Sequence, residues 1–117
     1  MYHYHAKVVR VVDGDTLDVG IDLGFAITTR QRLRLARVDT PELNSSDREE
    51  RIKAINAKDY VFQLCFNHGW LCTVKTEKTG KYGRWLAEVY MGDDKNEQVH
   101  LNEVLIEQGW GWKPKKN

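Results

Sequence analysis

Three carboxylates stand where strands are expected to give way to loops, at Asp15, Asp39 and Glu42. Oxygen ligands of this kind suit a hard divalent cation such as Ca²⁺ or Mg²⁺. Two arginines accompany them, because Arg34 lies on the strand that runs into Asp39 and Arg84 begins another strand after a Gly-containing loop. Cleavage of a phosphodiester needs cationic groups near the phosphorus, a positioned water and a group that takes its proton. These five side chains could supply each of those roles.

The short motifs that carry these residues have ordinary structural explanations when each is taken alone. Asp13-Gly14-Asp15-Thr16 is typical of a turn between two strands. Asp39-Thr40-Pro41-Glu42 is typical of a strand exit that begins a loop. Only the combination of carboxylates and arginines indicates a site that acts on a phosphoester.

The N-terminal half of the chain has the two-residue period of strands. Apolar and polar residues alternate over 17–23, and a β-branched run over 8–12 precedes them, so the turn between the two predicts a hairpin. A third strand is expected over 28–38, ending before Pro41. The site residues would thus lie at the ends of neighbouring strands.

A long helix is expected next, because Ser46 and Glu49 have the form of a capping box and apolar residues follow at helical spacing as far as His68-Gly69. Strands over 71–75 and 85–90 and a last helix that ends at Gly109 complete the order. The order predicts an α+β fold, mainly β, in which helices pack outside a five-stranded Greek-key barrel of the OB-fold type.

The composition restricts the possible functions. The 117 residues suit one domain, which we place at 1–112, followed by a short basic tail at 113–117. Eighteen basic and seventeen acidic residues give a net charge of +1, which argues against a protein that holds nucleic acid through a broad basic field alone. Cys65 and Cys72 are interpreted as reduced core residues. No signal peptide or membrane span is recognised, so a cytoplasmic protein is expected unless a leader is missing.

Four blocks of the sequence resemble the staphylococcal nuclease (thermonuclease) family in their order and spacing. The resemblance covers most of the chain and includes the positions that the family uses for catalysis. It implies an OB-type five-stranded barrel with about three helices. The blocks are Asp13-Gly14-Asp15-Thr16, residues 34–42, Lys81-Tyr82-Gly83-Arg84, and Leu101-Asn102-Glu103 with Gln108-Gly109.

The resemblance also implies a metal and a reaction. Asp15 and Asp39 would bind Ca²⁺ through their carboxylates, and the backbone carbonyl of Thr40 would add a ligand. Glu42 would orient or deprotonate the attacking water. The implied reaction is hydrolysis of the P–O5′ bond in DNA or RNA, with in-line attack by water, which leaves 3′-phosphate ends.

Further residues are implied to contact the nucleic acid. Arg34 and Arg84 would grip the scissile phosphate and stabilise the transition state. Lys81 and Tyr82 match positions that contact a neighbouring nucleotide phosphate. Trp112 stands where the family often has a tyrosine near the bound base, so its indole could stack on that base.

The alternative is a noncatalytic OB-fold module that binds single-stranded nucleic acid. Trp110, Trp112 and the Lys-rich end could stack on and steer a strand without cutting it. The retained carboxylates argue against this alternative, because a surface that only binds phosphates has no need of them. For Trp110 we favour packing on the barrel over base stacking. Nothing in the pattern demands a second chain, so a monomer is expected.

Overall fold

The computed structural model describes residues 2–78 and 85–114. Lys81, Tyr82 and Arg84, which the sequence analysis assigns to substrate binding and catalysis, lie outside these described residues, as does most of the basic tail. None of the described helices is long and apolar enough to cross a membrane.

The predicted barrel is present, and its strands are β1 (Tyr2–Asp13), β2 (Thr16–Asp22), β3 (Thr28–Leu35), β4 (Leu71–Lys78) and β5 (Trp85–Met91). Its strands are hydrogen-bonded in the order β3-β2-β1-β4-β5, and a parallel pairing of β3 with β5 closes the barrel. The long β1 pairs with β4 through its first half and with β2 through its second half, with irregularities in register between Val8 and Arg10 and between Val11 and Asp13. A two-residue strand, β6 (Val99–His100), pairs with the edge of β5.

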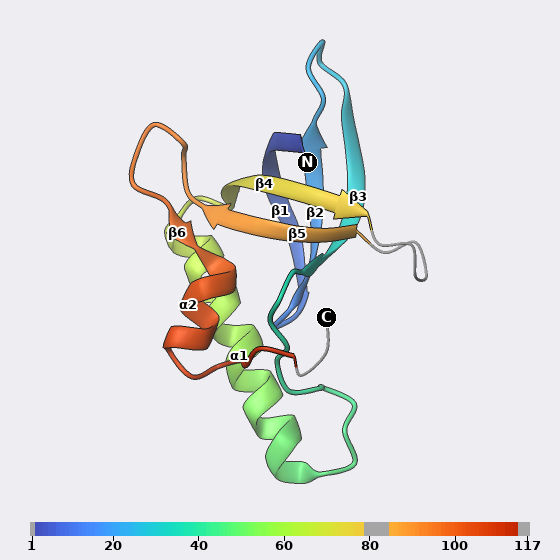
Figure 1. Ribbon diagram of the computed structural model, residues 1–117, viewed down its shortest axis with the longest axis vertical. Helices are drawn as coiled ribbons and strands as arrows, with labels where there is room; N and C mark the ends of the chain where they lie inside the picture. The colour runs from blue at the N-terminus through green and yellow to red at the C-terminus, as the bar shows by residue number, and fades with distance from the viewer. Residues whose placement is uncertain (1, 79–84, 115–117) are drawn as a thin grey trace.

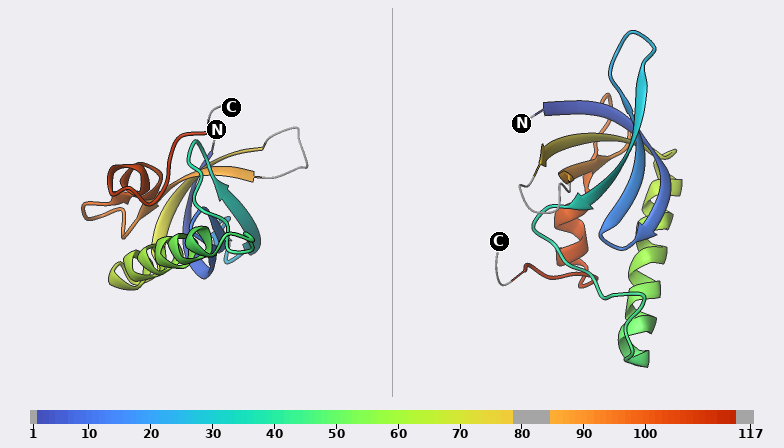
Figure 2. Two further views of the ribbon diagram at one scale, coloured as in Figure 1. Left: turned by 90° about the horizontal axis from the view of Figure 1, so that it is seen from below. Right: turned by 90° about the vertical axis from the view of Figure 1, so that its right-hand side faces the viewer.

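The described part of the chain contains two helices, α1 (Arg48–Asn67) and α2 (Leu101–Glu107), rather than the three that the family resemblance implies. The expectation of about three helices is therefore wrong for these residues. Helix α1 packs against β1, and α2 packs against β5. The β2–β3 hairpin projects at one end of the long axis, whereas α1 extends toward the other end (Figure 1 and Figure 2).

Several element boundaries differ from the sequence prediction: β1 begins six residues before the expected 8–12, β4 runs three residues past the expected 71–75, and two further boundaries have a side-chain cause. The strand expected to reach residue 38 ends at Leu35, because the chain turns at Arg37, which has a positive φ of 62° and pairs with Glu88 on β5. The N-cap of α1 is Asp47 rather than Ser46, because the Asp47 carboxylate accepts a hydrogen bond from the N–H of Glu49 (3.0 Å). Both differences arise from side-chain contacts that periodicity does not reveal.

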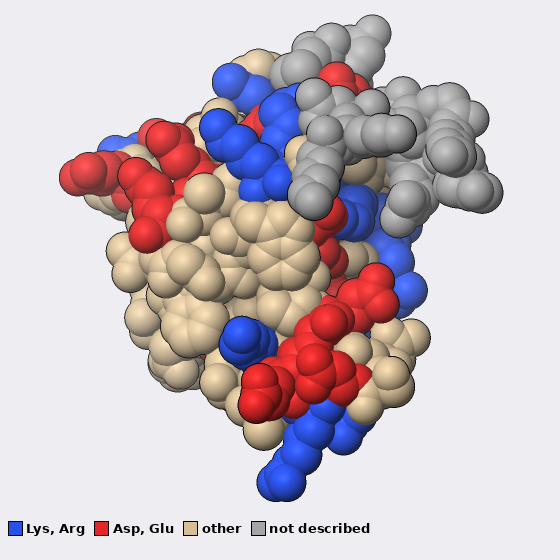
Figure 3. All heavy atoms as spheres, turned by 60° about the horizontal axis from the view of Figure 1, so that its bottom comes forward, with Lys and Arg blue, Asp and Glu red and all other residues tan. Residues whose placement is uncertain are grey.

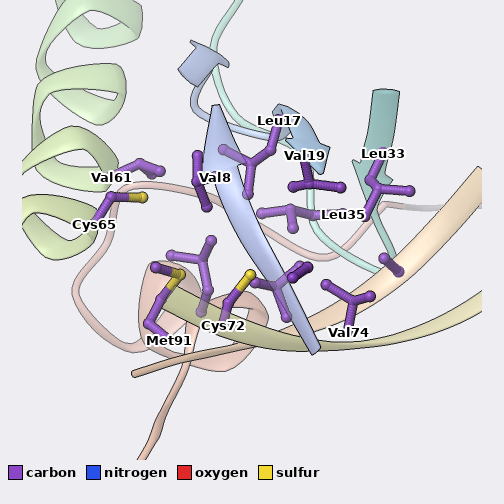
Figure 4. Close-up of a cluster of buried hydrophobic side chains, with 14 of the residues drawn as sticks. Val8, Leu17, Val19, Leu33, Leu35, Val61, Cys65, Cys72, Val74 and Met91 are labelled. Carbon is purple, nitrogen blue, oxygen red and sulfur yellow. The ribbon is translucent and has the colours of Figure 1, made fainter. Parts of the chain in front are cut away.

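The core fills the interior of the barrel and the space between the barrel and α1. The inward face of the β1–β2–β3 sheet carries alternating apolar residues, and Val61 and Cys65 of α1 reach toward Val8 on β1 (Figure 4). Cys65 and Cys72 are free and buried, and burial raises the pKa of each thiol to about 12, so both are unreactive core residues as predicted.

One buried polar side chain ties α2 to the strands that carry the site. The Asn102 amide donates to the carbonyls of Ala36 and Ala87 (2.9 Å each), and its oxygen accepts from the N–H of Val89 (2.9 Å). All three of these hydrogen bonds join the Asn102 amide to backbone atoms, and together they fix the end of β3 against β5. Asn102 therefore holds in place the segment that leads to Asp39.

Candidate active site

The polar cluster lies where β2 begins and β3 ends. The β1–β2 turn delivers Asp15, and the strand register places Thr16 directly opposite Arg34. The N–H of Leu35 donates to the carbonyl of Asp15 (2.9 Å), so the backbone itself joins the turn to the end of β3. The segment after β3 then returns Asp39 to the same place. The structure thus brings together residues that are predicted from separate motifs.

Asp15 is the most buried carboxylate of the cluster, with an exposed fraction of 9%. Its Oδ2 accepts from the N–H of Thr40 (3.1 Å) and lies 3.4 Å from Nη1 of Arg34, while its Oδ1 accepts from the hydroxyl of Thr16 (3.1 Å). Burial, with the neighbouring Asp13 carboxylate as a further cause, raises the pKa of Asp15 to about 6 despite the charge of Arg34. The ionised form of Asp15 therefore needs more positive charge than Arg34 supplies.

Arg34 is fixed by the residues around it. Its Nη1 donates to the carbonyls of Leu35 (3.1 Å) and Val38 (2.8 Å), and its Nη2 donates to the carboxylate of Asp39. The side chain is only 21% exposed, so the guanidinium is held at the end of β3 rather than free in solvent. A guanidinium held in this way presents a defined set of donors to an anion.

Asp39 is clamped by the C-terminal segment. The N–H of Asp39 donates to the carbonyl of Trp112 (2.8 Å), and the N–H of Trp112 donates to the carbonyl of Asp39 (2.9 Å), so the two form an isolated antiparallel bridge. Gly111 permits this approach, because a Cβ there would lie 2.7 Å from the Asp39 carbonyl oxygen and 2.9 Å from Cγ2 of Val38. Sequence reasoning missed this bridge.

Thr40 lies buried beneath the cluster. Its N–H donates to Asp15, and its hydroxyl oxygen is the only buried side-chain polar atom in the described residues without a hydrogen-bond partner. The hydroxyl faces Gly14, where a Cβ would lie 2.8 Å from Oγ1. The glycine of the Asp-Gly-Asp turn is thus needed for close packing against Thr40.

A cleft of about 620 Å³ opens beside this cluster, and the predicted residues Asp15, Arg34, Asp39, Thr40, Glu42 and Trp112 all line it. Glu42 is exposed, and its N–H donates to the carboxylate of Glu50 in the first turn of α1 (3.4 Å). Glu50 and Asn44 also line the cleft and were not predicted. The sequence held no signal for them beyond a polar stretch after Glu42.

The two tryptophans near the C-terminus differ as expected. Trp110 packs on the core and stacks on Tyr60, with ring centroids 5.4 Å apart, which confirms the packing interpretation. Trp112 is 50% exposed and lines the cleft, so its indole is accessible to a bound molecule.

Charge around this end of the molecule is mixed. On the face shown in Figure 3, acidic and basic side chains gather in separate groups around a wide uncharged area. The described residues on this face therefore form no continuous basic field, which agrees with the net charge of +1. Any attraction for a phosphate here must come from particular side chains.

The donor set fits a hard cation. Asp15, Asp39 and the backbone of Thr40 offer oxygen only, and the buried Asp15 lacks full charge compensation. Among the described residues, no three His, Cys, Asp or Glu side chains gather closely enough to hold a metal ion by themselves. Two carboxylates and a carbonyl would leave the remaining ligands to water or substrate, as is usual for Mg²⁺ and common for Ca²⁺.

Comparisons with known proteins agree with this arrangement. The model of the family described as "Staphylococcal nuclease homologue" matches residues 32–117. The chain is 31% identical to a thermonuclease of Staphylococcus hyicus over 103 residues (88% of this chain and 55% of that protein). It is 28% identical to a micrococcal nuclease of Shigella flexneri over 115 residues (93% and 58%) and 32% identical to an uncharacterized endonuclease of Escherichia coli O157:H7 over 108 residues (92% and 60%). It thus spans somewhat more than half of each relative's length, and the chain belongs to the staphylococcal nuclease homologue family.

Proposed function

We propose that this protein is a Ca²⁺-dependent nuclease that hydrolyses the P–O5′ bond of DNA or RNA and leaves 3′-phosphate ends. The observation that carries the proposal is the convergence of Asp15, Arg34 and Asp39 at one wall of the cleft. The family membership and the nuclease names of three relatives support it.

The burial of this wall is suited to electrostatic catalysis. Arg34 is held by two carbonyls and by Asp39, so little reorganisation is needed when negative charge grows on a nearby phosphate. Arg84 would provide the second cation, although it lies outside the described residues.

Asp15, Asp39 and the backbone carbonyl of Thr40 would hold the cation. Bound there, Ca²⁺ would supply charge that stabilises the transition state and would compensate the buried Asp15 carboxylate. The raised pKa of Asp15 supports this assignment. The protein groups around the carboxylate do not by themselves stabilise its ionised form, whereas a bound cation would.

Glu42 would act on water from the exposed side of the cleft. Its carboxylate is exposed, unlike that of Asp15, and its backbone is linked to α1 through Glu50. An exposed carboxylate at a cleft can accept a proton and release it to solvent after each turnover. Trp112 would stack on a base, and Lys81 with Tyr82 would contact the next phosphate.

The decisive experiment compares the wild type with Glu42→Gln on end-labelled single-stranded DNA, in Ca²⁺, in Mg²⁺ and with a chelator. We expect Ca²⁺-dependent products with 3′-phosphate ends and a loss of at least about 100-fold in rate in the variant. Ca²⁺ binding, measured by calorimetry, and the free energy of unfolding should stay close to the wild-type values because Glu42 lies on the exposed rim.

Other outcomes decide against parts of this proposal. Cleavage that persists in the chelator would exclude the metal, and 5′-phosphate products would exclude the proposed bond. Absence of cleavage, together with salt-sensitive binding of the same DNA in the chelator, would support the noncatalytic module instead, which the exposed Trp112 also suits.

A further inference from the structure

The outward face of the β1–β2–β3 sheet presents an ordered array of side chains. Its inward face packs on the core, and side chains alternate between the two faces along each strand. Residues that oppose one another across the three strands form these rows: Asp13, Thr16 and Arg34; then Arg10, Asp18 and Arg32; then Lys7, Gly20 and Arg30. The first row belongs to the cleft, and the other two continue away from it.

The second and third rows are rich in exposed cations. Lys7, Arg10, Arg30 and Arg32 are all exposed, and we call these four residues the basic ladder. Arg30 and Arg32 keep 64% and 59% of their side-chain surface in solvent. In a chain whose net charge is only +1, this is a local excess of positive charge that adjoins the cleft.

One carboxylate lies within the ladder and organises it. Asp18 accepts two hydrogen bonds from Arg32 (2.8 and 3.2 Å), and Nη2 of Arg30 lies 4.0 Å away. The hydrogen bond from Arg32, followed by the charges of Arg32, Arg30 and Arg10, lowers the pKa of Asp18. Asp18 neutralises one of the four cations and leaves the others in excess. The next row, Asp22 with Thr28, ends the basic region.

Gly20 leaves an open strip in the third row. It separates Lys7 from Arg30 and carries no side chain, and a Cβ built there would meet nothing closer than Cγ2 of Val9 at 3.9 Å. A narrow chain could therefore lie over Gly20 with a cation on each side. The position also accepts a side chain without a clash, which makes it suitable for a test.

The spacing of the ladder suits a strand of nucleic acid. Arg34, Arg32 and Arg30 lie on one face of β3 at intervals of two residues, or about 7 Å. This interval is comparable to the separation of successive phosphates along an extended single strand. The array also begins at Arg34, which faces the reacting phosphate in the proposed function, so a strand that leaves the cleft along β3 meets further cations in line.

We propose that the basic ladder binds the sugar–phosphate backbone of the substrate strand beyond the nucleotides held in the cleft, so that the protein favours long single strands over short ones. This inference rests on the proposed nuclease function and extends its substrate to a polynucleotide. Exposed arginines and lysines bind phosphates with little regard to sequence, so the ladder adds affinity and not base preference.

The test inserts charge at Gly20. Gly20→Glu and the uncharged, equally large Gly20→Gln are prepared in a Glu42→Gln background, so that binding is measured without cleavage. The probes are a labelled oligothymidine of about 12 nucleotides, within the span of an OB-fold, and a labelled trinucleotide. We expect Gly20→Glu to weaken binding of the long probe about tenfold and Gly20→Gln by less than about threefold, with a smaller effect of Glu on the trinucleotide.

A second variant avoids any change in packing. Arg30→Gln should weaken binding of the long probe about threefold and reduce the slope of log affinity against log salt by about 0.7. Lys53→Gln, on an exposed position of α1, is the control for total charge and should change neither quantity. Thermal unfolding of each variant checks that the fold is retained.

The outcomes separate this inference from the proposed function. Equal effects of Gly20→Glu and Gly20→Gln, or equal loss for long and short probes, would overturn the ladder while leaving the nuclease proposal intact. Length-dependent binding that Gly20→Glu abolishes, in a protein whose wild type cuts neither probe, would support the ladder and reject the nuclease.

Discussion

The cleft has two sides that are built differently. Its inner wall consists of Asp15, Arg34 and Asp39, which are partly or largely buried and joined to one another and to the backbone. Its rim consists of Glu42 and the indole of Trp112, which are exposed. Groups on the wall are positioned by the fold, and changing them alters the free energy of unfolding. Groups on the rim can serve the reaction with little effect on that free energy.

Asp15→Asn, on the wall, should separate activity from stability most clearly, because it should lower activity and raise the free energy of unfolding. Burial raises the pKa of Asp15 to about 6, so the folded state at neutral pH carries an ionised group that its surroundings disfavour. Without metal, the wild type should therefore gain stability as the pH falls from 7 through 6, and the full gain is present below the unfolded value of 3.8.

Asp15→Asn carries no ionisable group at this position, so its stability lacks this dependence on pH. We expect it to exceed the wild type by about 1–3 kcal/mol in free energy of unfolding at pH 7.5 with a chelator, and by less at pH 5. Denaturant titrations at the two pH values measure both quantities, with the exposed Asp59→Asn on α1 as the control. A variant that is less stable than the wild type at pH 7.5 would contradict this description of the wall.

Gly111→Ala should damage the wall through the backbone. The added Cβ would meet the Asp39 carbonyl oxygen at 2.7 Å, so the bridge to Trp112 must open or shift. We expect a loss of about 1–3 kcal/mol in stability and a lower catalytic rate, because Asp39 loses its clamp. Gly20→Ala is the matched control, since its Cβ has room, and should stay within about 0.5 kcal/mol of the wild type. Equal stability of the two variants would mean that the bridge does not hold Asp39.

Trp112→Ala tests the rim and has the smallest expected effect on the fold, and Trp110→Ala is its comparison. Trp112→Ala should weaken binding of a single-stranded oligonucleotide by about 1–3 kcal/mol with little change in thermal unfolding. Trp110→Ala should instead destabilise the fold by about 2–4 kcal/mol, because Trp110 packs on the core and on Tyr60. Similar unfolding temperatures for both variants would mean that the Trp112 indole supports the fold as much as the packed Trp110 does.

The five barrel strands and both described helices could be predicted from sequence because each has a local signal, whereas the two-residue β6 was missed. Alternation fixes which face of β2 is buried, and Gly109 marks the end of α2, where it adopts a φ of 79°. Element ends were less predictable, since β3 ends where Arg37 pairs with Glu88, a residue 51 positions away. A contact of that kind leaves no periodic trace in the sequence.

Some residues of the site were likewise predictable from sequence and others were not. Asp15, Arg34 and Asp39 are recognisable because charged residues at strand ends stand out from an apolar alternation. The bridge between Asp39 and Trp112 is made by main-chain atoms, which every residue has, so only the space requirement at Gly111 could have hinted at it. Glu50 enters the cleft through the direction of α1, which depends on the packing of the whole helix.

The bridge also bears on the timing of events during synthesis. Asp39 leaves the ribosome more than seventy residues before Trp112, whose backbone clamps it. Chains are made from the N-terminus at about 5–20 residues per second, so the unclamped interval lasts several seconds while the nascent chain lies beside its own messenger RNA. Asp39 is thus fixed only after a segment more than seventy residues later has been made, so this wall of the cleft is completed long after the strands that form it.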